Sequence, residues 1–170
     1  IGMYMAMTGA RLRPADCVYA EICDAYMPSD RLNDFIAELR AGADVDATSA
    51  RLSEAPGDSA LAEAREAIDG CFAGGSVEEI LAALDADGGE WSAKQLGIMA
   101  GKSPTAQKVA HRQLREGATL AFDDCMIMEY RMAQCFMEGG DFFEGVRAVV
   151  VDKDMAPKWS PASLSDLSDA

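Results

Sequence analysis

Apolar residues recur along most of the chain at the three- and four-residue spacing that places them on one face of an α-helix. Leu32, Phe35, Ile36 and Leu39 follow this spacing, and Gly42 stands where such a helix would end. The pattern predicts further helices over 1–8, 14–24, 48–53, 59–72, 76–88, 91–100, 103–116 and 120–138. Only Ala25–Met27 has the pattern of a strand, and so short a strand is not stable without a sheet. We therefore expect an all-α chain with at most one very short strand near residues 25–27.

Several predicted helices begin with residues that satisfy free amides of the first turn. Ser76 and Glu79 have the spacing of a capping box, as do Asp141 and Glu144. Ser103–Pro104 combines a capping serine with a proline at the first helical position. We therefore interpret Asp141 and Glu144 as the start of a short apolar helix after Gly139–Gly140, with a catalytic role as the alternative.

The predicted helix over 120–138 is apolar on so many sides that it is expected to lie inside a bundle or under a second subunit. After the next helix the chain reaches a charged turn and Trp159, whose indole is a large apolar anchor. Phe142, Phe143 and Trp159 are where we expect this part of the chain to contact a core or a second copy. The sequence therefore predicts a homo-oligomer, with a dimer favoured.

Composition narrows the function classes. With 29 acidic and 15 basic residues the net charge is −14, which argues against a nucleic-acid partner. The five cysteines include no C-x-x-C pair and the chain has one histidine, so we expect reduced thiols in a cytoplasmic protein and no metal site. No apolar run reaches the ~18 residues of a membrane span, so no membrane association is expected.

Basic residues are concentrated between Trp91 and Arg115, where no acidic residue occurs. They are Lys94, Lys102, Lys108, Arg112 and Arg115. In the helix over 103–116 the last three share one face, with His111 beside them and expected to be exposed. This face would suit a phosphate or an acidic partner, or it would pair with acidic helices of the same protein. His111 lacks a carboxylate or hydroxyl at helical spacing, so we do not expect it to act as a catalytic base.

No other group of residues predicts a catalytic site. The carboxylates nearest to apolar runs are Glu78, Glu79, Asp123, Asp124 and Glu129, and no pattern places any of them in a dry cleft. The sequence contains no G-x-S-x-G, P-loop or G-x-G-x-x-G motif.

Several segments resemble one enzyme superfamily. The segment Ala6–Asp16, Ala-Met-Thr-Gly-Ala-Arg-Leu-Arg-Pro-Ala-Asp, resembles the stretch that follows the active site in crotonases, the enoyl-CoA hydratase/isomerase superfamily. Segments 103–114, 128–131, 141–148 and 152–159 resemble one branch of it, the 3-hydroxyisobutyryl-CoA hydrolases, and order and spacing match across about 160 residues. The chain departs from the branch at Ala106–Gln107 and Ala110–His111, where small polar or aliphatic residues are usual, and this leaves the acyl substrate open.

The resemblance implies the helical C-terminal region of a crotonase fold without its ββα spiral core. In that family two backbone amides polarise the thioester carbonyl, and a carboxylate activates water or forms a transient anhydride. These groups belong to the core that would precede Ile1, so no catalytic residue is expected in this chain, and the chain alone is expected to be inactive. Coenzyme A would enter only as part of an acyl-CoA substrate, with no separate cofactor. Lys102, Lys108 and Arg112 are then candidates for contact with the CoA phosphates.

These interpretations divide the chain and leave three functions open. Residues 1–28 would end the crotonase core, 29–101 would form a helical insert, 102–159 a C-terminal helical domain, and 160–170 a flexible tail.

The first function is hydrolysis of 3-hydroxyisobutyryl-CoA or a similar short acyl-CoA by the longer protein, with these helices covering the CoA site and mediating oligomerisation. The second is an enoyl-CoA hydratase or isomerase of the same superfamily. The third is a stand-alone helical dimerisation module without catalysis.

Overall fold

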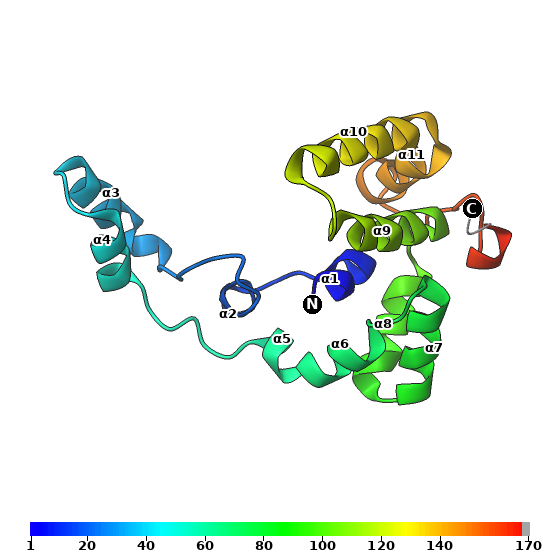
Figure 1. Ribbon diagram of the computed structural model, residues 1–170, viewed down its shortest axis with the longest axis horizontal. Helices are drawn as coiled ribbons and strands as arrows, with labels where there is room; N and C mark the ends of the chain where they lie inside the picture. Colours follow the sequence, from blue (N-terminus) through cyan, green and yellow to red (C-terminus); the bar gives the residue numbers. More distant parts are fainter. Residues whose placement is uncertain (168–170) are drawn as a thin grey trace. The chain divides into compact units, whose positions relative to one another are not determined.

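The computed structural model describes residues 1–167, which fold into helices joined by turns (Figure 1). The helices are α1 Gly2–Thr8, α2 Pro14–Tyr19, η1 Ser29–Arg31, α3 Leu32–Arg40, α4 Val45–Leu52, α5 Ala60–Glu63, α6 Arg65–Cys71, α7 Val77–Asp87, α8 Glu90–Ala100, α9 Pro104–Gly117, α10 Phe122–Glu138, α11 Gly140–Val146, the π-helix η2 Arg147–Val151 and η3 Leu164–Asp166. In place of the short strand, Tyr26 forms a single isolated bridge with Glu54. No strand occurs within residues 1–167, so the all-α prediction is confirmed.

Local capping residues set two helix starts as predicted. The Ser76 hydroxyl accepts a hydrogen bond from the Glu79 amide at 3.1 Å, and the Glu79 carboxylate accepts one from the Gly75 amide at 2.6 Å. The Ser103 hydroxyl accepts from the Ala106 amide at 3.1 Å, with Pro104 at the first helical position. Ser76 and Ser103 are therefore N-caps, and each satisfies an amide that has no partner inside its helix.

Three predicted helix boundaries differ from the structure. The helix from Pro14 ends at Tyr19, because Glu21 adopts a left-handed conformation (φ 56°) that an α-helix cannot continue through. The helix expected from Thr48 begins earlier, since the Asp44 carboxylate accepts from the Ala47 amide at 2.9 Å and caps α4. The helix over 59–72 is interrupted at Ala64 (φ −89°, ψ 3°), which separates α5 from α6.

The chain forms two compact units. The first contains Ile1 with residues 10–68, and the second contains residues 2–9 and 69 onward. In the first unit α3 contacts α4 and α2 contacts α5. The buried carboxylate of Asp16 joins the latter pair, because it accepts from the Ser59 hydroxyl at 2.8 Å and from the Leu61 amide at 3.0 Å. The division into 1–28, 29–101, 102–159 and 160–170 that is expected from the sequence stays a prediction.

The second unit holds the larger apolar core. Helices α1 and α7 each contact α8 and α9, and Met7, Ile80, Leu84 and Met99 are almost completely buried in the core that they form. Beside this core, α10 packs on α11 without burying any of its own residues. The second unit therefore joins a well-packed half to a half whose apolar side chains remain exposed.

The segment after Trp159 is partly ordered by its own contacts. Residues 164–166 form η3, and the Lys108 ammonium donates to the Leu167 carbonyl at 3.5 Å. The expected flexible tail also included residues 168–170, which lie outside the described residues.

Candidate functional site

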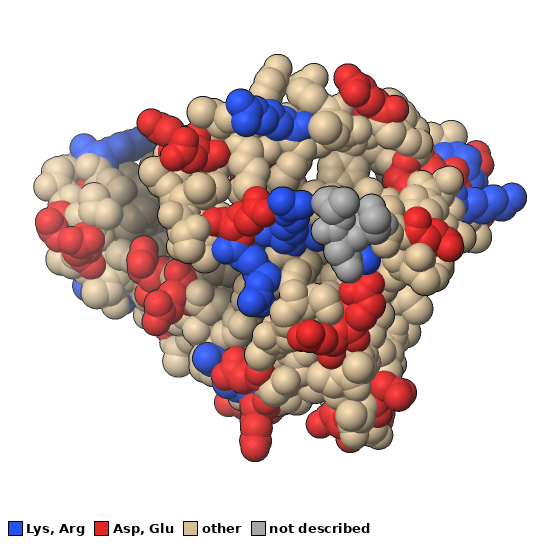
Figure 2. All heavy atoms as spheres, turned by 45° about the vertical axis from the view of Figure 1, so that its right-hand side comes forward, with Lys and Arg blue, Asp and Glu red and all other residues tan. Residues whose placement is uncertain are grey.

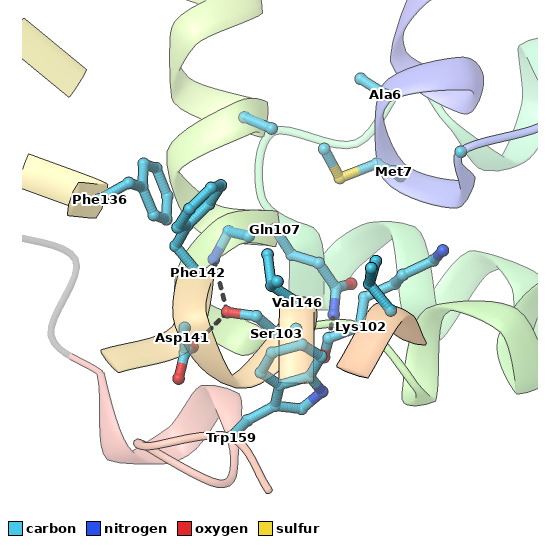
Figure 3. Close-up of a pocket in the computed structure, with 15 residues that line it drawn as sticks. Ala6, Met7, Lys102, Ser103, Gln107, Phe136, Asp141, Phe142, Val146 and Trp159 are labelled. Atoms are coloured by element: carbon cyan, nitrogen blue, oxygen red, sulfur yellow. Dashed lines mark hydrogen bonds between the residues drawn. The ribbon is translucent and has the colours of Figure 1, made fainter. Parts of the chain in front are cut away.

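A cavity of about 530 Å³ opens in the second unit, between α1, the start of α9, and α11 with η2 (Figure 3). Its lining is mostly apolar and includes the predicted residues Lys102, Phe142 and Trp159. The other lining residues are Ala6, Met7, Gly9, Ser103, Ala106, Gln107, Ala110, Phe136, Asp141, Gly145, Val146 and Val150. A concave, mainly apolar site with a few polar groups is typical of a small-molecule pocket. We call it the Gln107 cavity.

Ser103 and Asp141 form a polar pair at the wall of the Gln107 cavity. The Ser103 hydroxyl donates to one Asp141 carboxylate oxygen at 2.5 Å, and the Ser160 amide donates to the other at 3.0 Å. The N-cap of α11 is Gly139, so the predicted capping role of Asp141 is wrong. Asp141 instead joins the start of α9 to the segment after Trp159, two regions far apart in the sequence.

Glu144 also has a partner that the capping prediction missed. The Arg147 guanidinium donates to both of its carboxylate oxygens at 2.8 Å, and the Lys158 amide donates to one of them at 2.6 Å. Hydrogen bonds from Arg147 and then from Lys158 lower the pKa of Glu144 to about 2. The predicted capping role of Glu144 is therefore wrong too, and the carboxylate stays ionised at neutral pH, which does not suit a general acid.

Arg147 is the centre of this polar cluster. It also donates to Asp152 and Asp154 at 2.7 Å each and to the Ala156 carbonyl at 3.2 Å. Within the turn that these contacts close, Lys153 and Met155 have positive φ angles of 57° and 55°. Non-glycine residues adopt this conformation only when their surroundings hold them there. The Arg147 cluster therefore fixes the turn that leads to Trp159.

Trp159 contacts two parts of its own chain. Its indole N–H donates to the Gly101 carbonyl at 3.0 Å. Its ring lies so close to α11 that a Cβ added at Gly145 would meet it at 3.3 Å. Phe142 and Phe143 pack edge to face with a centroid distance of 5.4 Å and remain 45% and 53% exposed. Trp159 is thus held by this chain, whereas both phenylalanines keep an apolar surface that is open to another contact.

The three residues predicted to contact the CoA phosphates do not all line the same cavity. Lys102 lines the Gln107 cavity, whereas Lys108 and Arg112 line a second cavity of about 550 Å³. There Lys108 pairs with Glu78 at 3.0 Å and Arg112 with Glu116 at 2.6 Å. Figure 2 shows basic side chains beside acidic ones on the face in view. Lys108 and Arg112 therefore have acidic partners in the same chain.

His111 was expected to be exposed on this basic face, and that prediction is wrong. It is 5% exposed, and its Nε2 lies 3.1 Å from the Gly74 carbonyl oxygen. Because a carbonyl only accepts, Nε2 carries the proton in this contact. Arg115 donates to the same carbonyl at 3.3 Å. The turn before α7 thus covers His111, a contact that the spacing within one helix does not reveal.

Gln107 also lines the cavity, although the sequence alone did not identify it as a site residue. Its side chain is 6% exposed, and its amide nitrogen donates to the Met99 carbonyl at 3.0 Å. Its amide oxygen has no partner among the described residues. The available signal was its departure from the small polar or aliphatic residues that are usual at this position in the resembling branch.

The described part of the chain contains no candidate metal site. Between residues 1 and 167 no group of three His, Cys, Asp or Glu side chains is arranged to hold a metal ion. All five cysteines are free thiols. In the same range none of the helices has the length and apolar character to cross a membrane.

Comparison with known proteins places this geometry in context. The family model described as enoyl-CoA hydratase/isomerase matches residues 1–170. The chain is 38% identical to a mitochondrial 3-hydroxyisobutyryl-CoA hydrolase from Xenopus laevis and 36% identical to one from Homo sapiens, over 99% of the chain and 46% of each relative. It therefore spans about half the length of these relatives. Both relatives are named as mitochondrial proteins, which does not support the predicted cytoplasmic location. That location stays a prediction for this chain.

Two solved structures are similar to the fold. A carnitinyl-CoA dehydratase from Mycobacterium thermoresistibile matches with a TM-score of 0.90 and 33% identity, over 98% of this chain and 48% of that chain. An enoyl-CoA hydratase from Rhodobacter sphaeroides matches with a TM-score of 0.85 and 29% identity, over 99% of this chain and 48% of that chain. The helical arrangement thus recurs as about half of each of these two proteins.

Proposed function

Because this chain belongs to the enoyl-CoA hydratase/isomerase family, we propose that it is the helical C-terminal part of a longer enzyme that hydrolyses a short acyl-CoA thioester. The substrate proposed is 3-hydroxyisobutyryl-CoA or a close analogue. The observation that carries this proposal is the similarity to 3-hydroxyisobutyryl-CoA hydrolases over 99% of the chain. The thioester carbonyl would be polarised by two backbone amides of the upstream core, with a carboxylate of that core activating water or forming a transient anhydride.

In this proposal the chain shapes one wall of the acyl-CoA site. The Gln107 cavity supplies an apolar surface, and the Arg147 cluster fixes the turn that brings Trp159 to it. Asp141 and Glu144 act as structural anions, because each accepts two or more hydrogen bonds within the chain. The chain itself contributes binding surface and no reacting group.

An enoyl-CoA hydratase or isomerase of the same superfamily is the second candidate, since the two solved structures described above are named as a carnitinyl-CoA dehydratase and an enoyl-CoA hydratase. The two reactions differ in the bond that breaks. Hydrolysis releases a free thiol, whereas hydration adds water across a carbon–carbon double bond and keeps the thioester. Full-length protein should release free CoA from 3-hydroxyisobutyryl-CoA without hydrating crotonyl-CoA. Hydration without thiol release would favour the second candidate.

Contact with the CoA phosphates is proposed for Lys102, Lys108 and Arg112. Lys102 has the strongest support, because it lines the Gln107 cavity, whereas Lys108 and Arg112 are paired with carboxylates of the same chain. Contact by Lys108 or Arg112 would compete with Glu78 or Glu116. In the full-length enzyme, Lys102→Glu should raise KM for the acyl-CoA about tenfold, which corresponds to one lost charge-assisted contact. A Lys94→Glu control should not change it, and an unchanged KM in Lys102→Glu would refute the contact.

Self-association is proposed as the second role of these helices, with a dimer favoured. Support comes from the exposed apolar side chains along α10 and α11, which include Phe122, Ile127, Tyr130, Phe142 and Phe143. A monomeric protein rarely exposes so many adjacent apolar side chains to water. A stand-alone dimerisation module would have the same surface, and thiol release by the full-length protein separates that function from the proposed enzyme.

A further inference from the structure

The segment that follows Trp159 returns to α9. Its short helix η3 contacts α9, and Leu164 is half-buried against the apolar core of the second unit. Farther along, the Leu167 carbonyl accepts a hydrogen bond from the Lys108 ammonium at 3.5 Å. We call residues 161–167 the strap. The strap therefore meets α9 at a residue that is proposed to contact the CoA phosphates.

The strap also forms part of a cavity wall. Leu167 lines the cavity of about 550 Å³ that contains Lys108, and we call this the Lys108 cavity. Its lining includes three cationic side chains and two carboxylates, which are Lys108, Arg112, Arg115, Glu78 and Glu116. An excess of cationic side chains in a concave site favours an anion. The strap thus borders a site whose charge suits a phosphate.

Lys108 is the cation of this cavity that the strap contacts. Its side chain is only 17% exposed, and its ammonium lies 3.0 Å from a Glu78 carboxylate oxygen. The Leu167 carbonyl is neutral and lies farther away, at 3.5 Å. An ionised phosphate oxygen forms a stronger hydrogen bond to an ammonium than a neutral carbonyl does. A phosphate that approaches Lys108 should therefore displace the strap before it displaces Glu78.

Few contacts hold the strap in place. None of residues 161–167 is buried. The Ser163 hydroxyl donates to the Asp166 carboxylate at 2.7 Å, and the Leu167 amide donates to the Leu164 carbonyl at 3.1 Å. These two hydrogen bonds order the strap internally without joining it to α9. Because a segment with little buried surface opens at a low cost in free energy, the strap can leave Lys108 while the core helices stay folded.

We propose that the strap is an autoinhibitory element: it closes over Lys108, and a phosphate of the acyl-CoA must displace the Leu167 carbonyl to reach the ammonium. This inference rests on the proposed contact between Lys108 and the CoA phosphates. When a closed state excludes the ligand, the apparent affinity is reduced to the open fraction of its intrinsic value. The strap therefore raises KM for the acyl-CoA and leaves kcat unchanged, because the chain contributes no reacting group.

The test removes the apolar anchor of the strap in the full-length enzyme. Leu164→Ser should lower KM for 3-hydroxyisobutyryl-CoA about fivefold, at unchanged kcat per folded molecule, because a larger fraction of the strap is open. KM does not depend on the fraction of enzyme that folds, so partial loss of the variant does not obscure the result. Ser163→Ala keeps Leu164 but removes the hydrogen bond to Asp166, and it should lower KM about twofold.

Two controls show whether the effect passes through the strap and Lys108. Leu120 is 41% exposed, lies outside η3 and does not line the Lys108 cavity, so Leu120→Ser should leave KM unchanged. In a Lys108→Met background, Leu164→Ser should no longer lower KM, because the ammonium for which the carbonyl and the phosphate compete is absent. An unchanged KM in Leu164→Ser, an equal fall in Leu120→Ser, or a fall that persists without Lys108 would overturn the inference.

Hydrogen exchange separates this inference from the proposed function. Free CoA added to the full-length wild type should speed amide exchange in the peptide 161–167, because a bound phosphate displaces the strap. If the protein hydrolyses no thioester but binds free CoA with faster exchange in the strap, the proposed hydrolysis is wrong and the inference stands. If it hydrolyses the thioester and exchange in the strap is unchanged at saturating CoA, hydrolysis stands and the inference is wrong. If free CoA does not bind, both the phosphate contact and the inference are wrong.

Discussion

Helices α7 and α10 both carry an apolar face, but the chain covers only that of α7. In α7, Val77, Ile80 and Leu84 are at most 2% exposed, because α1, α8 and α9 pack around them. In α10, Phe122 is 75% exposed and Tyr130 is 68% exposed, and no residue of the helix is buried. An apolar pattern in the sequence therefore indicates that a helix face needs to be buried. Only the tertiary structure shows which segment buries it.

Truncating an apolar residue should cost far more stability in α7 than in α10. Leu84→Ala should lower the free energy of unfolding by about 3 kcal/mol, because it leaves a cavity in the core. Ile127→Ala on α10 should change it by less than about 0.5 kcal/mol, because Ile127 is 48% exposed. Chemical denaturation at a concentration low enough to exclude association measures both. Equal losses in the two variants would contradict the contrast.

The Arg147 cluster should make α11 sensitive to acid. The pKa of Glu144 falls from 4.5 to about 2 on folding, so the carboxylate stabilises the folded chain above about pH 4.5 and loses this effect as the pH falls toward 2. Glu144→Gln should therefore lower Tm at pH 6, and the difference from the wild type should shrink as the pH approaches 2. Thermal melts from pH 6 to 2.5 measure this change.

A control for the acid effect lies at the end of α10. Glu138→Gln removes a carboxylate that is exposed and has no partner among the described residues. It should leave the pH dependence of Tm unchanged. A difference between wild type and Glu144→Gln that stays constant with pH would show that Glu144 acts by packing instead of charge.

The smallest expected effect concerns the contact of α11 with Trp159. Gly145→Ala places a methyl group 3.3 Å from the indole ring, so it should destabilise the chain by about 1 kcal/mol and shift the Trp159 indole N–H resonance. The matched control is Gly97→Ala in α8, where no atom lies within 4 Å of the new methyl group. That change should stabilise the chain by up to about 1 kcal/mol through helix propensity. Equal effects would show that the ring moves aside freely.

Local signals in the sequence predicted the elements well. Ser76 and Ser103 cap the helices that their positions predicted, and Gly88 ends α7 in a left-handed conformation. These features depend on residues within one helical turn, so spacing alone reveals them. The family and the all-α portion of the crotonase fold, both expected from the resemblance, are confirmed as well.

The site was harder to predict, because its contacts join distant segments. Asp141 and Glu144 have the spacing of a capping box, yet their partners include Ser103, 38 positions earlier, and Lys158, 14 positions later. His111 sits among basic residues in the sequence but is buried against Gly74 from another turn. The sequence distinguishes Gln107 only as a departure from the small polar or aliphatic residues that are usual at this position in the resembling branch. In each case the side chain has a partner that is not on its own helix face.

We propose that a second copy of the chain covers the exposed apolar surface of α10 and α11. Sedimentation velocity of the chain at micromolar concentration tests it directly. We expect a dimer whose dissociation constant rises at least about tenfold with Ile127→Glu. Ile22→Glu, at an exposed apolar residue of the first unit, should leave the dissociation constant unchanged. A monomeric mass combined with cooperative unfolding would contradict the claim.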